Sequence, residues 1–548
     1  DETLAEFVAA FREKKTEKKQ KAENLTLEER LAGYVVEGSK DGLYADLDEA
    51  LAKYAPLDII NGPLMKGMDE VGRLFNNNEL IVAEVLQSAE VMKASVAYLE
   101  PYMEKTETAV KGKILLATVK GDVHDIGKNL VEIILSNNGY QIVNLGIKVP
   151  PEQLIEACRN EKPDAIGLSG LLVKSAQQMV VTAQDLQAAG IDVPILVGGA
   201  ALTRKFTKER IAPEYGGLVL YAKDAMQGLE LANKLMDPAE RSKLADEQRA
   251  EREALAAGGK KENNLPKPSR AVTSDVDRNA PVFVPPDFER HILRDYPLDH
   301  LLPYVNMQML LGHHLGLRGK VEELLKAGDA KAQELEALVK DIFAEGKERG
   351  TLKVSGMYQF FPAQSNGDEI IVYDPADHGR VLKTFRFPRQ QAEPYLCLAD
   401  YLKPVDSGEM DYVGFLAVTA GAGIREQAER LRERGDYLRS HALQAAALET
   451  AEAMAERVHH IMRDRWGFPD PPDMTMKERF GARYQGIRVS FGYPACPNLE
   501  DQALLFDLIK PQDIGIELTE GFMMEPEASV TAMVFAHPQA KYFNVDNA

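Results

Sequence analysis

Hydrophobic and polar positions follow three different patterns along this chain of 548 residues. Residues 26–104 carry helical spacing throughout, as where Leu47 and Leu51 recur at i and i+4, and this pattern predicts a small helical bundle. Residues 105–236 alternate short apolar runs with helical stretches, which predicts a doubly wound parallel sheet of the Rossmann or flavodoxin type. Residues 281–548 mix long helical patterns with short β runs, so we expect a third, α+β domain.

The same patterns predict where individual elements lie. In the first domain a helix is expected over Val82–Leu99. In the third domain we expect two long helices, over Lys320–Glu345 and Arg425–Arg465, and short strands over Glu369–Tyr373 and Tyr412–Val418. The strands of the parallel sheet are expected at residues 113–119, 140–145, 164–169, 193–197 and 218–221, with a last helix over roughly 224–235.

Two segments are expected to connect domains. Residues 1–25 are charged and helix-prone, so they predict a linker or the end of a preceding helix. Residues 237–280 are first charged and rich in Ala, then rich in Asn and Pro, which predicts a polar linker that is part helical and part extended. A linker of this length lets the neighbouring domains move relative to each other, and we hypothesise that it forms a hinge.

Charge and composition narrow the possible functions. The formal net charge of −20 disfavours nucleic-acid binding, because phosphate contacts need a basic face. No apolar run approaches the ~20 residues of a membrane helix. The three cysteines are far apart and lack C-x-x-C spacing, which disfavours a disulfide framework or a zinc site and fits a reducing cytoplasm. The chain begins at Asp1 without a secretory signal, and we expect it to be part of a longer protein.

The segment KGDVHDIGKN, residues 120–129, holds the clearest candidate chemistry. It lies between a predicted strand and a predicted helix, so His124 is expected at the carboxyl end of the strand, where open α/β sheets bind ligands. One ring nitrogen of His124 could bind a metal while the other donates to Asp122, which would set the tautomer. Taken alone, a histidine in a loop is more often an ordinary loop residue.

Two turns after later strands strengthen the functional interpretation. They are Ser169-Gly170-Leu171 and Gly198-Gly199. Together with the D-x-H-x-x-G pattern of residues 122–127, they resemble the cobalamin-binding domain of corrinoid enzymes, in which the histidine replaces the cofactor's own base below the cobalt. The longer string ATVKGDVHDIGKN, residues 117–129, looks most like the cobalamin-dependent methionine synthase family.

This resemblance implies roles for individual residues. His124 would be the cobalt ligand, Asp122 its hydrogen-bond acceptor, and Ser175 the end of a relay to that acid. Because proton uptake competes with metal binding, we hypothesise that protonation of His124 and its partners favours a His-off state. Val173 stands where the family usually has Thr, which puts one hydroxyl contact to the nucleotide tail in doubt. The cofactor-binding residues implied by the resemblance are Gly121, Val123, Asp125, Gly127, Ser169, Leu171, Val173, Gly198 and Gly199.

The helical bundle resembles the cap that covers the upper corrin face in this family. Residues 63–75, PLMKGMDEVGRLF, match its M-x-x-V-G-x-x-F element. The resemblance implies that Phe75 and Val82 shield the cobalt-bound methyl group, which would limit side reactions by excluding water. The plainer interpretation is bundle core, and we favour it for Met68 and Val71.

Near the end of the chain, RVSFGYPACP at residues 488–497 resembles an element of the family's reactivation domain, which binds S-adenosylmethionine. Arg488 has a fork suited to the methionine carboxylate. Asn306 aligns with a position that is commonly Asp, so it supplies no charge to an ammonium group. Cys496 is not expected to be a nucleophile, because no histidine is near it in the sequence. The implied S-adenosylmethionine-binding residues are Asn306, Arg488, Gly492, Tyr493, Pro494, Ala495 and Tyr542.

The resemblance also implies an activity. The parent enzyme would transfer a methyl group from methyltetrahydrofolate to homocysteine through methylcobalamin, with its substrate domains upstream of this chain. This part, expected as a monomer, would hold cobalamin and restore methylcobalamin from cob(II)alamin with S-adenosylmethionine and an electron from a flavodoxin-like donor. The cap would have to move aside. Two alternatives are a non-catalytic corrinoid carrier, which leaves residues 281–548 without a role, and a cobalamin-based sensor, which should carry a basic DNA-binding module.

Overall fold

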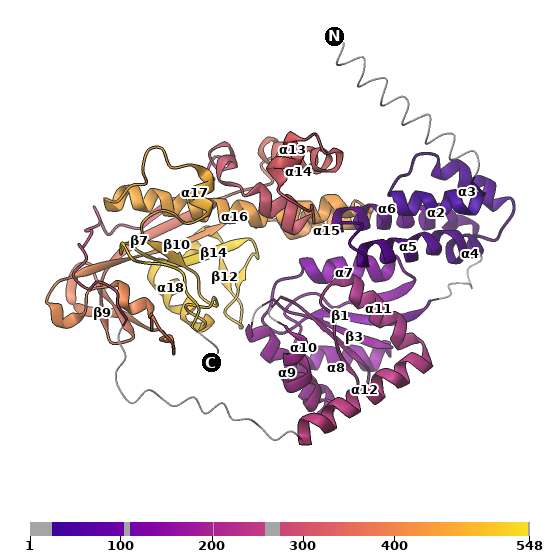
Figure 1. The fold of residues 1–548 in the computed structure, drawn as a ribbon, viewed down its shortest axis with the longest axis horizontal. Helices are drawn as coiled ribbons and strands as arrows, with labels where there is room; N and C mark the ends of the chain where they lie inside the picture. Colours follow the sequence, from indigo (N-terminus) through magenta and orange to yellow (C-terminus); the bar gives the residue numbers. More distant parts are fainter. Residues whose placement is uncertain (1–24, 104–109, 172, 201, 258–273, 546–548) are drawn as a thin grey trace, which may run out of the picture.

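The computed structural model describes residues 25–103, 110–171, 173–200, 202–257 and 274–545. The predicted N-terminal linker therefore lies outside the described residues except at its last position. Three folded parts are visible in Figure 1: a helical bundle at upper right, a parallel-sheet domain below it, and a C-terminal domain at left. This architecture confirms the predicted fold class, a multidomain chain with helical, doubly wound α/β and α+β parts.

The helical bundle forms because each of its helices buries one apolar face. Helix α2 begins at a capping box, in which the backbone N–H of Glu29 donates to Thr26 Oγ1 at 3.2 Å and the backbone N–H of Thr26 donates to Glu29 Oε2 at 2.8 Å. Leu31 and Val35 of α2 are fully buried in the bundle core. The helices are α2 (Leu27–Glu37), α3 (Leu43–Leu51), α4 (Pro56–Ile59), α5 (Met65–Asn76) and α6 (Val82–Leu99), with a π-helical turn at Ile60–Leu64.

The second domain is a sheet of five parallel strands in the order β2-β1-β3-β4-β5. Helices α7 (Ile126–Ser136) and α11 (Ala225–Met236) pack together on one face, and α8 (Pro151–Glu161) and α9 (Val173–Ala188) pack on the other. Each predicted strand is confirmed to within two residues. The strands are β1 (Gly112–Thr118), β2 (Tyr140–Asn144), β3 (Ala165–Ser169), β4 (Ile195–Gly198) and β5 (Val219–Tyr221).

The first part of the predicted linker is a helix that is docked on the parallel-sheet domain. Helix α12 covers Pro238–Ala257, and its Arg252 donates from Nη2 to the carbonyl oxygens of Tyr215 at 2.7 Å and Gly217 at 3.1 Å. The segment 258–273 lies outside the described residues. The helical half of the linker is thus bound to the parallel-sheet domain. The hinge hypothesis therefore applies only to the residues after α12.

The C-terminal domain is built on an antiparallel sheet of seven strands. Its order is β11-β14-β10-β7-β8-β9, and β6 pairs with β7. The strands are β6 (His291–Leu293), β7 (Ser355–Asn366), β8 (Glu369–Asp374), β9 (Asp377–Arg386), β10 (Asp411–Thr419), β11 (Ile487–Val489) and β14 (Ser529–Phe535), with a separate ribbon of β12 (Glu517–Leu518) and β13 (Met524–Glu525). The helices are α13 (Val321–Lys326), α14 (Ala330–Glu348), α15 (Ile424–Arg434), α16 (Tyr437–Trp466), α17 (Met476–Phe480) and α18 (Gln502–Ile509).

Both long helices predicted for this domain are wrong in the same way, because each is broken by a glycine. Gly328 adopts a left-handed φ of +74° between α13 and α14, and Asp329 then caps α14 by accepting from the Ala332 N–H at 2.8 Å. Gly435, with a φ of +86°, ends α15 before α16 begins. A glycine in the left-handed conformation lets backbone N–H groups satisfy the last carbonyls of a helix, and so ends that helix. The apolar spacing of the sequence continues across this end, which is why it predicts one long helix.

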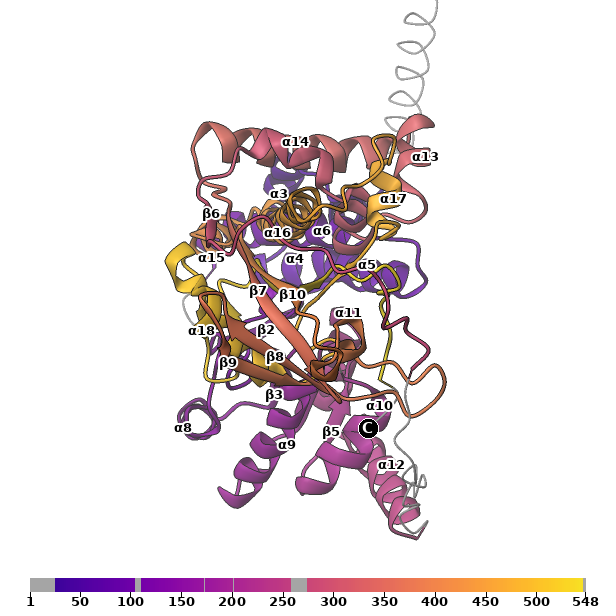
Figure 2. The same cartoon turned by 90° about the vertical axis from the view of Figure 1, so that its left-hand side faces the viewer.

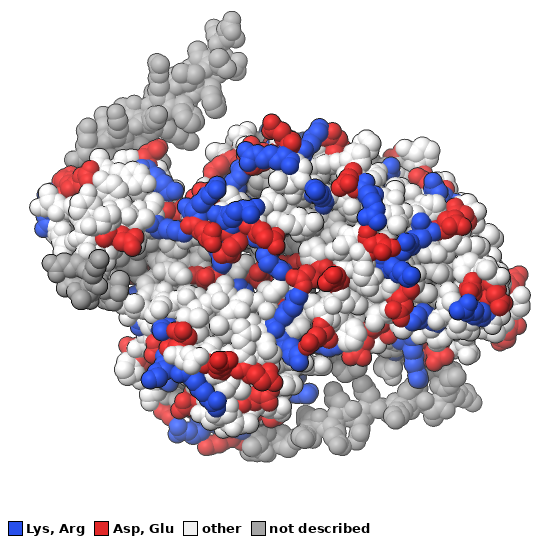
Figure 3. All heavy atoms as spheres, turned by 180° about the vertical axis from the view of Figure 1, so that it is seen from behind, with Lys and Arg blue, Asp and Glu red and all other residues white. Residues whose placement is uncertain are grey.

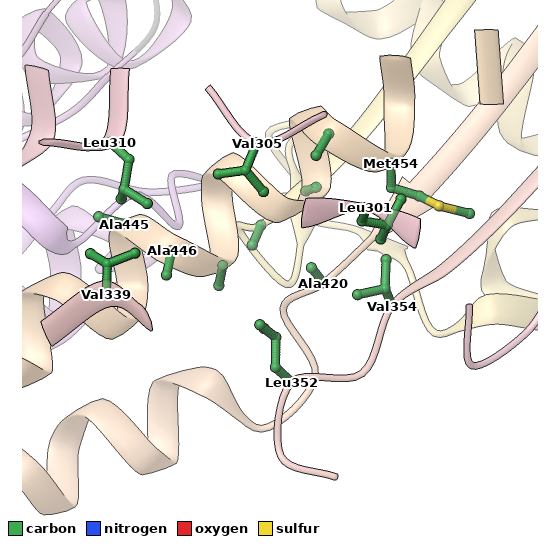
Figure 4. Close-up of a cluster of buried hydrophobic side chains, with 14 of the residues drawn as sticks. Leu301, Val305, Leu310, Val339, Leu352, Val354, Ala420, Ala445, Ala446 and Met454 are labelled. Carbon is green, nitrogen blue, oxygen red and sulfur yellow. The ribbon is translucent and has the colours of Figure 1, made fainter. Parts of the chain in front are cut away.

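Helix α16, 30 residues long, is the axis of the C-terminal core. Figure 4 shows Leu310 and Val339 facing Ala445 and Ala446 in the first half of this helix. The small alanines allow neighbouring segments to approach α16 closely, which favours dense packing. At its end lies Trp466, the single tryptophan of the chain, which is 1% exposed.

The three parts contact one another through specific hydrogen bonds. From the bundle, the Ala83 N–H donates to the Leu315 carbonyl at 3.3 Å and Glu90 Oε1 accepts from the Leu438 N–H at 2.9 Å. Figure 2 shows from the side how the C-terminal domain lies against the parallel-sheet domain. On the face in Figure 3, acidic and basic side chains are interspersed. Among the residues that the structure describes, no helix is both long and apolar enough to cross a membrane.

Candidate functional site

His124, Asp122 and Ser175 form the hydrogen-bonded relay that the sequence predicts. His124 follows β1, and its Nδ1 lies 2.6 Å from Asp122 Oδ1. Ser175 Oγ donates to Asp122 Oδ2 at 2.5 Å, and the Leu171 backbone N–H donates to the same oxygen at 2.8 Å. The Asp122 side chain is fully buried, so its carboxylate is held by these donors rather than by water.

The hydrogen bonds of the relay shift the pKa values of both Asp122 and His124. Burial opposes ionisation of Asp122, yet the hydrogen bond and the charge of His124 outweigh it and lower the pKa of that carboxyl below 3.8. Burial likewise opposes protonation of His124, but the hydrogen bond to Asp122 and the charge of Glu527 raise the pKa of the imidazole above 6.5. The pair therefore favours an imidazolium beside a carboxylate when no metal holds the ring.

We expect a pH window in which this pair stabilises the cofactor-free protein. The contribution of His124 is full below its unfolded pKa of about 6.5 and is lost as pH rises through the higher folded value. The contribution of Asp122 is present above 3.8 and is lost as pH falls through its lower folded pKa. An NMR titration of the His124 ring checks the prediction: Asp122→Asn should lower its pKa, and a wild-type value at or below 6.5 would contradict it.

A cavity of about 500 Å³ opens beside the relay, between α7 and α11 above the sheet. Its lining includes Gly127, Ser169, Gly198 and Gly199, all of them predicted cofactor contacts. A Cβ on Gly199 would lie 1.7 Å from the Gly170 carbonyl oxygen, so only glycine fits there. The cavity is mostly apolar with a few polar groups, which is typical of a site for a largely buried organic group.

These residues fit a cobalamin bound through His124. Nδ1 of His124 is engaged by Asp122, and Nε2 has no hydrogen-bond partner among the described residues. A neutral imidazole whose other nitrogen is held by a carboxylate is a common metal ligand. The adjoining 500 Å³ cavity has room for a nucleotide tail. Among the described residues no group of three or more His, Cys, Asp or Glu side chains is arranged to hold a metal ion.

A second cavity, of about 490 Å³, lies between the parallel-sheet domain and the C-terminal domain. His124 and Leu171 line it from one side. From the other side it is lined by predicted ligand residues of the C-terminal domain, namely Asn306, Arg488, Tyr493 and Tyr542. The structure thus brings the candidate cobalt ligand and the candidate S-adenosylmethionine site to one shared space.

The turn after β11 is shaped by glycine and by two backbone hydrogen bonds. Gly492 has a φ of +86°, its N–H donates to the Cys496 carbonyl at 2.9 Å, and the Cys496 N–H donates to the Tyr493 carbonyl at 2.9 Å. Pro494 and Ala495 lie inside this turn. Burial raises the pKa of the Cys496 thiol to about 12, which agrees with the expectation that it is not a nucleophile.

Several cavity residues were missed by the sequence reasoning. Glu449, Glu452 and Glu456 project from α16 into the cavity, and Tyr484 joins them. Glu527 lines this cavity and also a neighbouring one of about 290 Å³, and burial raises its pKa to about 7. The spacing of the three acids on α16 places them on one side of a helix and could have indicated a site. An acidic stripe on a helix is, however, more often a face exposed to solvent.

Three predicted cofactor residues, Phe75, Val82 and Val123, pack against parts of the protein other than the relay. Phe75 packs, half-buried, against the hydrophobic cluster that the bundle shares with the parallel-sheet domain, and Val82 packs against the hydrophobic core of the C-terminal domain. Neither lines the cavity that contains His124, so their shielding role stays a prediction for a different arrangement of the domains. Val123 is buried against the C-terminal domain, and the side chain of Val173 lies outside the described residues.

The remaining two predicted cofactor contacts, Gly121 and Asp125, lie in the same loop as His124. Gly121 has a φ of +78° and lies against the C-terminal domain, and Asp125 is the N-cap residue of α7. Asp125 is 8% exposed, and its Oδ2 lies 3.9 Å from Arg425 Nε across the domain interface. Both residues therefore contribute to how the loop meets the C-terminal domain.

Fold and site together define a B12-binding protein, and family models agree. Two models described as a B12 binding domain match residues 27–100 and 112–230. A third, described as the activation domain of vitamin B12 dependent methionine synthase, matches residues 297–548. The chain thus matches, in order, two B12 binding domains and the activation domain of vitamin B12 dependent methionine synthase.

Curated relatives agree with this assignment. The chain is 39% identical over 568 residues to methionine synthase of Mycobacterium tuberculosis (strain ATCC 25618 / H37Rv), an alignment that covers 95% of this chain and 46% of that protein. It is 37% identical over 572 residues to methionine synthase of Mycobacterium leprae (strain TN), with the same coverage of 95% and 46%. The chain thus spans about half the length of the curated relatives it matches.

Solved structures give weaker similarities. A crystal structure of the MetH reactivation domain bound to AdoHcy is 29% identical, with a TM-score of 0.48, and the match covers 51% of this chain and 87% of that chain. A methanol:cobalamin methyltransferase complex, MtaBC from Methanosarcina barkeri, is 29% identical with a TM-score of 0.35, covering 40% of this chain and 84% of that chain.

Proposed function

We propose that this chain holds cobalamin and remethylates it with S-adenosylmethionine. The observation that carries the proposal is the shared cavity of about 490 Å³, which has His124 on one side and Arg488 on the other. A methyl donor bound at Arg488 would face the cofactor held by His124 without a further change of domain arrangement. Such proximity and orientation contribute strongly to the rate of a group transfer.

The residues of the parallel-sheet domain would hold the cofactor. Bound cobalamin would supply the cobalt that accepts a methyl group and passes it on. His124 Nε2 would bind the cobalt, while Asp122 and Ser175 would set the tautomer of the ring and take up or release its proton. The glycine-lined cavity would exclude water from the nucleotide tail.

The residues of the C-terminal domain would hold the methyl donor. Arg488 would bind the methionine carboxylate through charge-assisted hydrogen bonds. The cavity is also lined by the acidic side chains of Glu449, Glu452 and Glu527. Burial raises the pKa of Glu452 and Glu527, and a cationic sulfonium bound nearby would favour their ionised forms. Asn306 Oδ1 accepts from the Met309 N–H at 3.2 Å, so its carbonyl is partly occupied in capping a helical turn.

The whole protein would then be a cobalamin-dependent methyltransferase that moves a methyl group from methyltetrahydrofolate to homocysteine. We propose that this part acts in the cytoplasm, as a monomer, and receives an electron from a flavodoxin-like donor. The alternative of a corrinoid carrier is less favoured, because it leaves the cavity around Arg488 and the match of residues 297–548 to an activation domain without a role.

The test is a visible spectrum of the whole chain reconstituted with cob(II)alamin, under a reductant, before and after S-adenosylmethionine is added. We expect conversion to a methylcobalamin spectrum. Arg488→Ala should weaken S-adenosylmethionine binding by roughly ten- to a hundred-fold, because hydrogen bonds to charged groups contribute about 1.5–3 kcal/mol. Arg483→Ala, at an exposed arginine outside the cavity, is the matched control. A bound corrinoid spectrum that never converts would support the carrier instead.

A further inference from the structure

One face of α16 carries a row of ionisable residues toward the cavity. Glu452, Glu456, His459 and Arg463 are spaced by four, three and four residues, so they lie one above the other on the same side of the helix. Glu452 lines the cavity, and Arg463 at the other end is fully buried. Glu456 lies between them and is 5% exposed.

Glu456 contacts three side chains in a buried hydrogen-bond cluster, namely Arg488, Tyr484 and Arg463. Its Oε2 accepts from Arg488 Nη1 and, at 3.1 Å, from the Tyr484 hydroxyl. Its Oε1 lies 3.4 Å from Arg463 Nη2. Arg463 in turn donates to both oxygens of Asp470, at 2.7 and 2.8 Å. Asp470 thus accepts the two shorter hydrogen bonds of Arg463, and Glu456 makes its closer contact with Arg488.

These contacts use one edge of the Arg488 guanidinium, whereas the other edge makes only a long ion pair with Glu452. Nη1 is held by Glu456 and lies 3.2 Å from the Tyr484 hydroxyl. Nε and Nη2 donate no hydrogen bond to any of the described residues, and Nη2 lies 3.8 Å from Glu452 Oε2. Arg488 lines the cavity, so its Nε and Nη2 form a two-donor fork of the kind that binds carboxylates.

We propose that Glu456 is a positioning residue, which holds Arg488 so that its Nε and Nη2 donors meet the carboxylate of the bound ligand. This inference rests on the proposed function. An arginine side chain has many rotamers, and fixing it before the ligand arrives removes an entropic cost of binding. In this role Glu456 acts through Arg488, to which its carboxylate is bound, and Tyr484 contacts both residues.

The experiment compares S-adenosylmethionine with decarboxylated S-adenosylmethionine, which keeps the sulfonium and the amine but lacks the carboxylate. Affinities are measured by calorimetry on the whole chain. We expect Glu456→Ala to weaken S-adenosylmethionine binding by roughly ten-fold, the usual effect of a lost hydrogen bond to a charged group, and to change binding of the decarboxylated ligand by less than about three-fold. Glu456→Gln keeps an acceptor for Arg488 and should restore most of the preference.

Controls separate positioning from a general loss of structure. Asp464→Ala removes a half-exposed carboxylate from the same helix and should leave both affinities unchanged. Tyr484→Phe, a smaller change in the same cluster, should shift the preference in the same direction as Glu456→Ala. Equal losses for the two ligands in Glu456→Ala and Tyr484→Phe would overturn the inference. If the wild-type chain binds neither ligand, the proposed function itself fails.

Discussion

Replacing Gly521 by valine is expected to reduce reductive remethylation by roughly ten- to a hundred-fold without changing affinity for cobalamin or S-adenosylmethionine. Gly521 of the C-terminal domain lies against Gly121 of the parallel-sheet domain, next to the loop that carries His124. A Cβ on Gly521 would lie 2.8 Å from the Gly121 carbonyl oxygen and 3.0 Å from its Cα. The two backbones must move apart to admit any side chain.

The expected size of the loss in remethylation rate follows from the free-energy cost of overpacking. Extra atoms in a packed contact cost about 1–3 kcal/mol, which lowers the population of this domain arrangement by roughly ten- to a hundred-fold. The same contact carries a hydrogen bond, because Thr519 Oγ1 donates to the Gly121 carbonyl at 2.7 Å. Gly521 has an ordinary φ, so valine does not strain the isolated C-terminal domain.

The measurement is the rate at which a bound cob(II)alamin spectrum converts to that of methylcobalamin. Gly379→Val is the matched control, because Gly379 lies on exposed strand β9 of the same domain and its added Cβ would approach only the Asp377 side chain. A wild-type rate in Gly521→Val would show that methyl transfer does not need this contact, and the proposal of a shared cavity would have to be given up.

Replacing Asp470 by alanine is expected to lower the free energy of unfolding of the C-terminal domain by about 3–5 kcal/mol, the usual cost of leaving one member of a buried ion pair. The Asp470 side chain is 2% exposed, and that of Arg463 is fully buried. Their bidentate pair is joined by Arg479 Nε at 3.0 Å from Asp470 Oδ2. Arg463 also lies over the Tyr484 ring, with Cζ 3.7 Å from the centroid.

The pair also makes stability depend on pH. Burial opposes ionisation of Asp470, but the hydrogen bonds from Arg463 and Arg479 and the charge of Arg463 together outweigh it and lower the pKa of that carboxyl below 3.8. A group with a lowered folded pKa stabilises above its unfolded value, and this contribution is lost as pH falls through the folded pKa. The difference between wild-type and Asp470→Ala should therefore shrink in acid.

Trp466 makes the measurement specific to this domain. It is the only tryptophan of the chain, is 1% exposed, and donates from Nε1 to the Phe283 carbonyl at 2.7 Å. Its fluorescence during urea unfolding reports the C-terminal domain alone. Asp464→Ala, at a half-exposed acid on α16, should change stability by less than about 0.5 kcal/mol. An equally small effect in Asp470→Ala would show that Arg463 finds another partner.

Local chemistry was determined by the sequence itself. Asp122 and His124 are two residues apart in one loop, so their hydrogen bond needs little more than a strand that ends before them. The five parallel strands follow from short apolar runs between helical patterns, and they lie within two residues of their predicted positions. The turn at Gly492 is likewise short-range, closed by two backbone hydrogen bonds within five residues.

Features that depend on distant residues were decided only by the tertiary structure. A glycine inside an apolar helical period does not reveal whether the backbone turns there, and both Gly328 and Gly435 do turn. The side of α16 that carries Glu456 faces the cavity because other segments cover the remaining sides. Phe75 and Val82 lie where the bundle packs against its neighbours, and that choice rests on contacts between domains. Such contacts join residues hundreds of positions apart, and no short-range pattern records them.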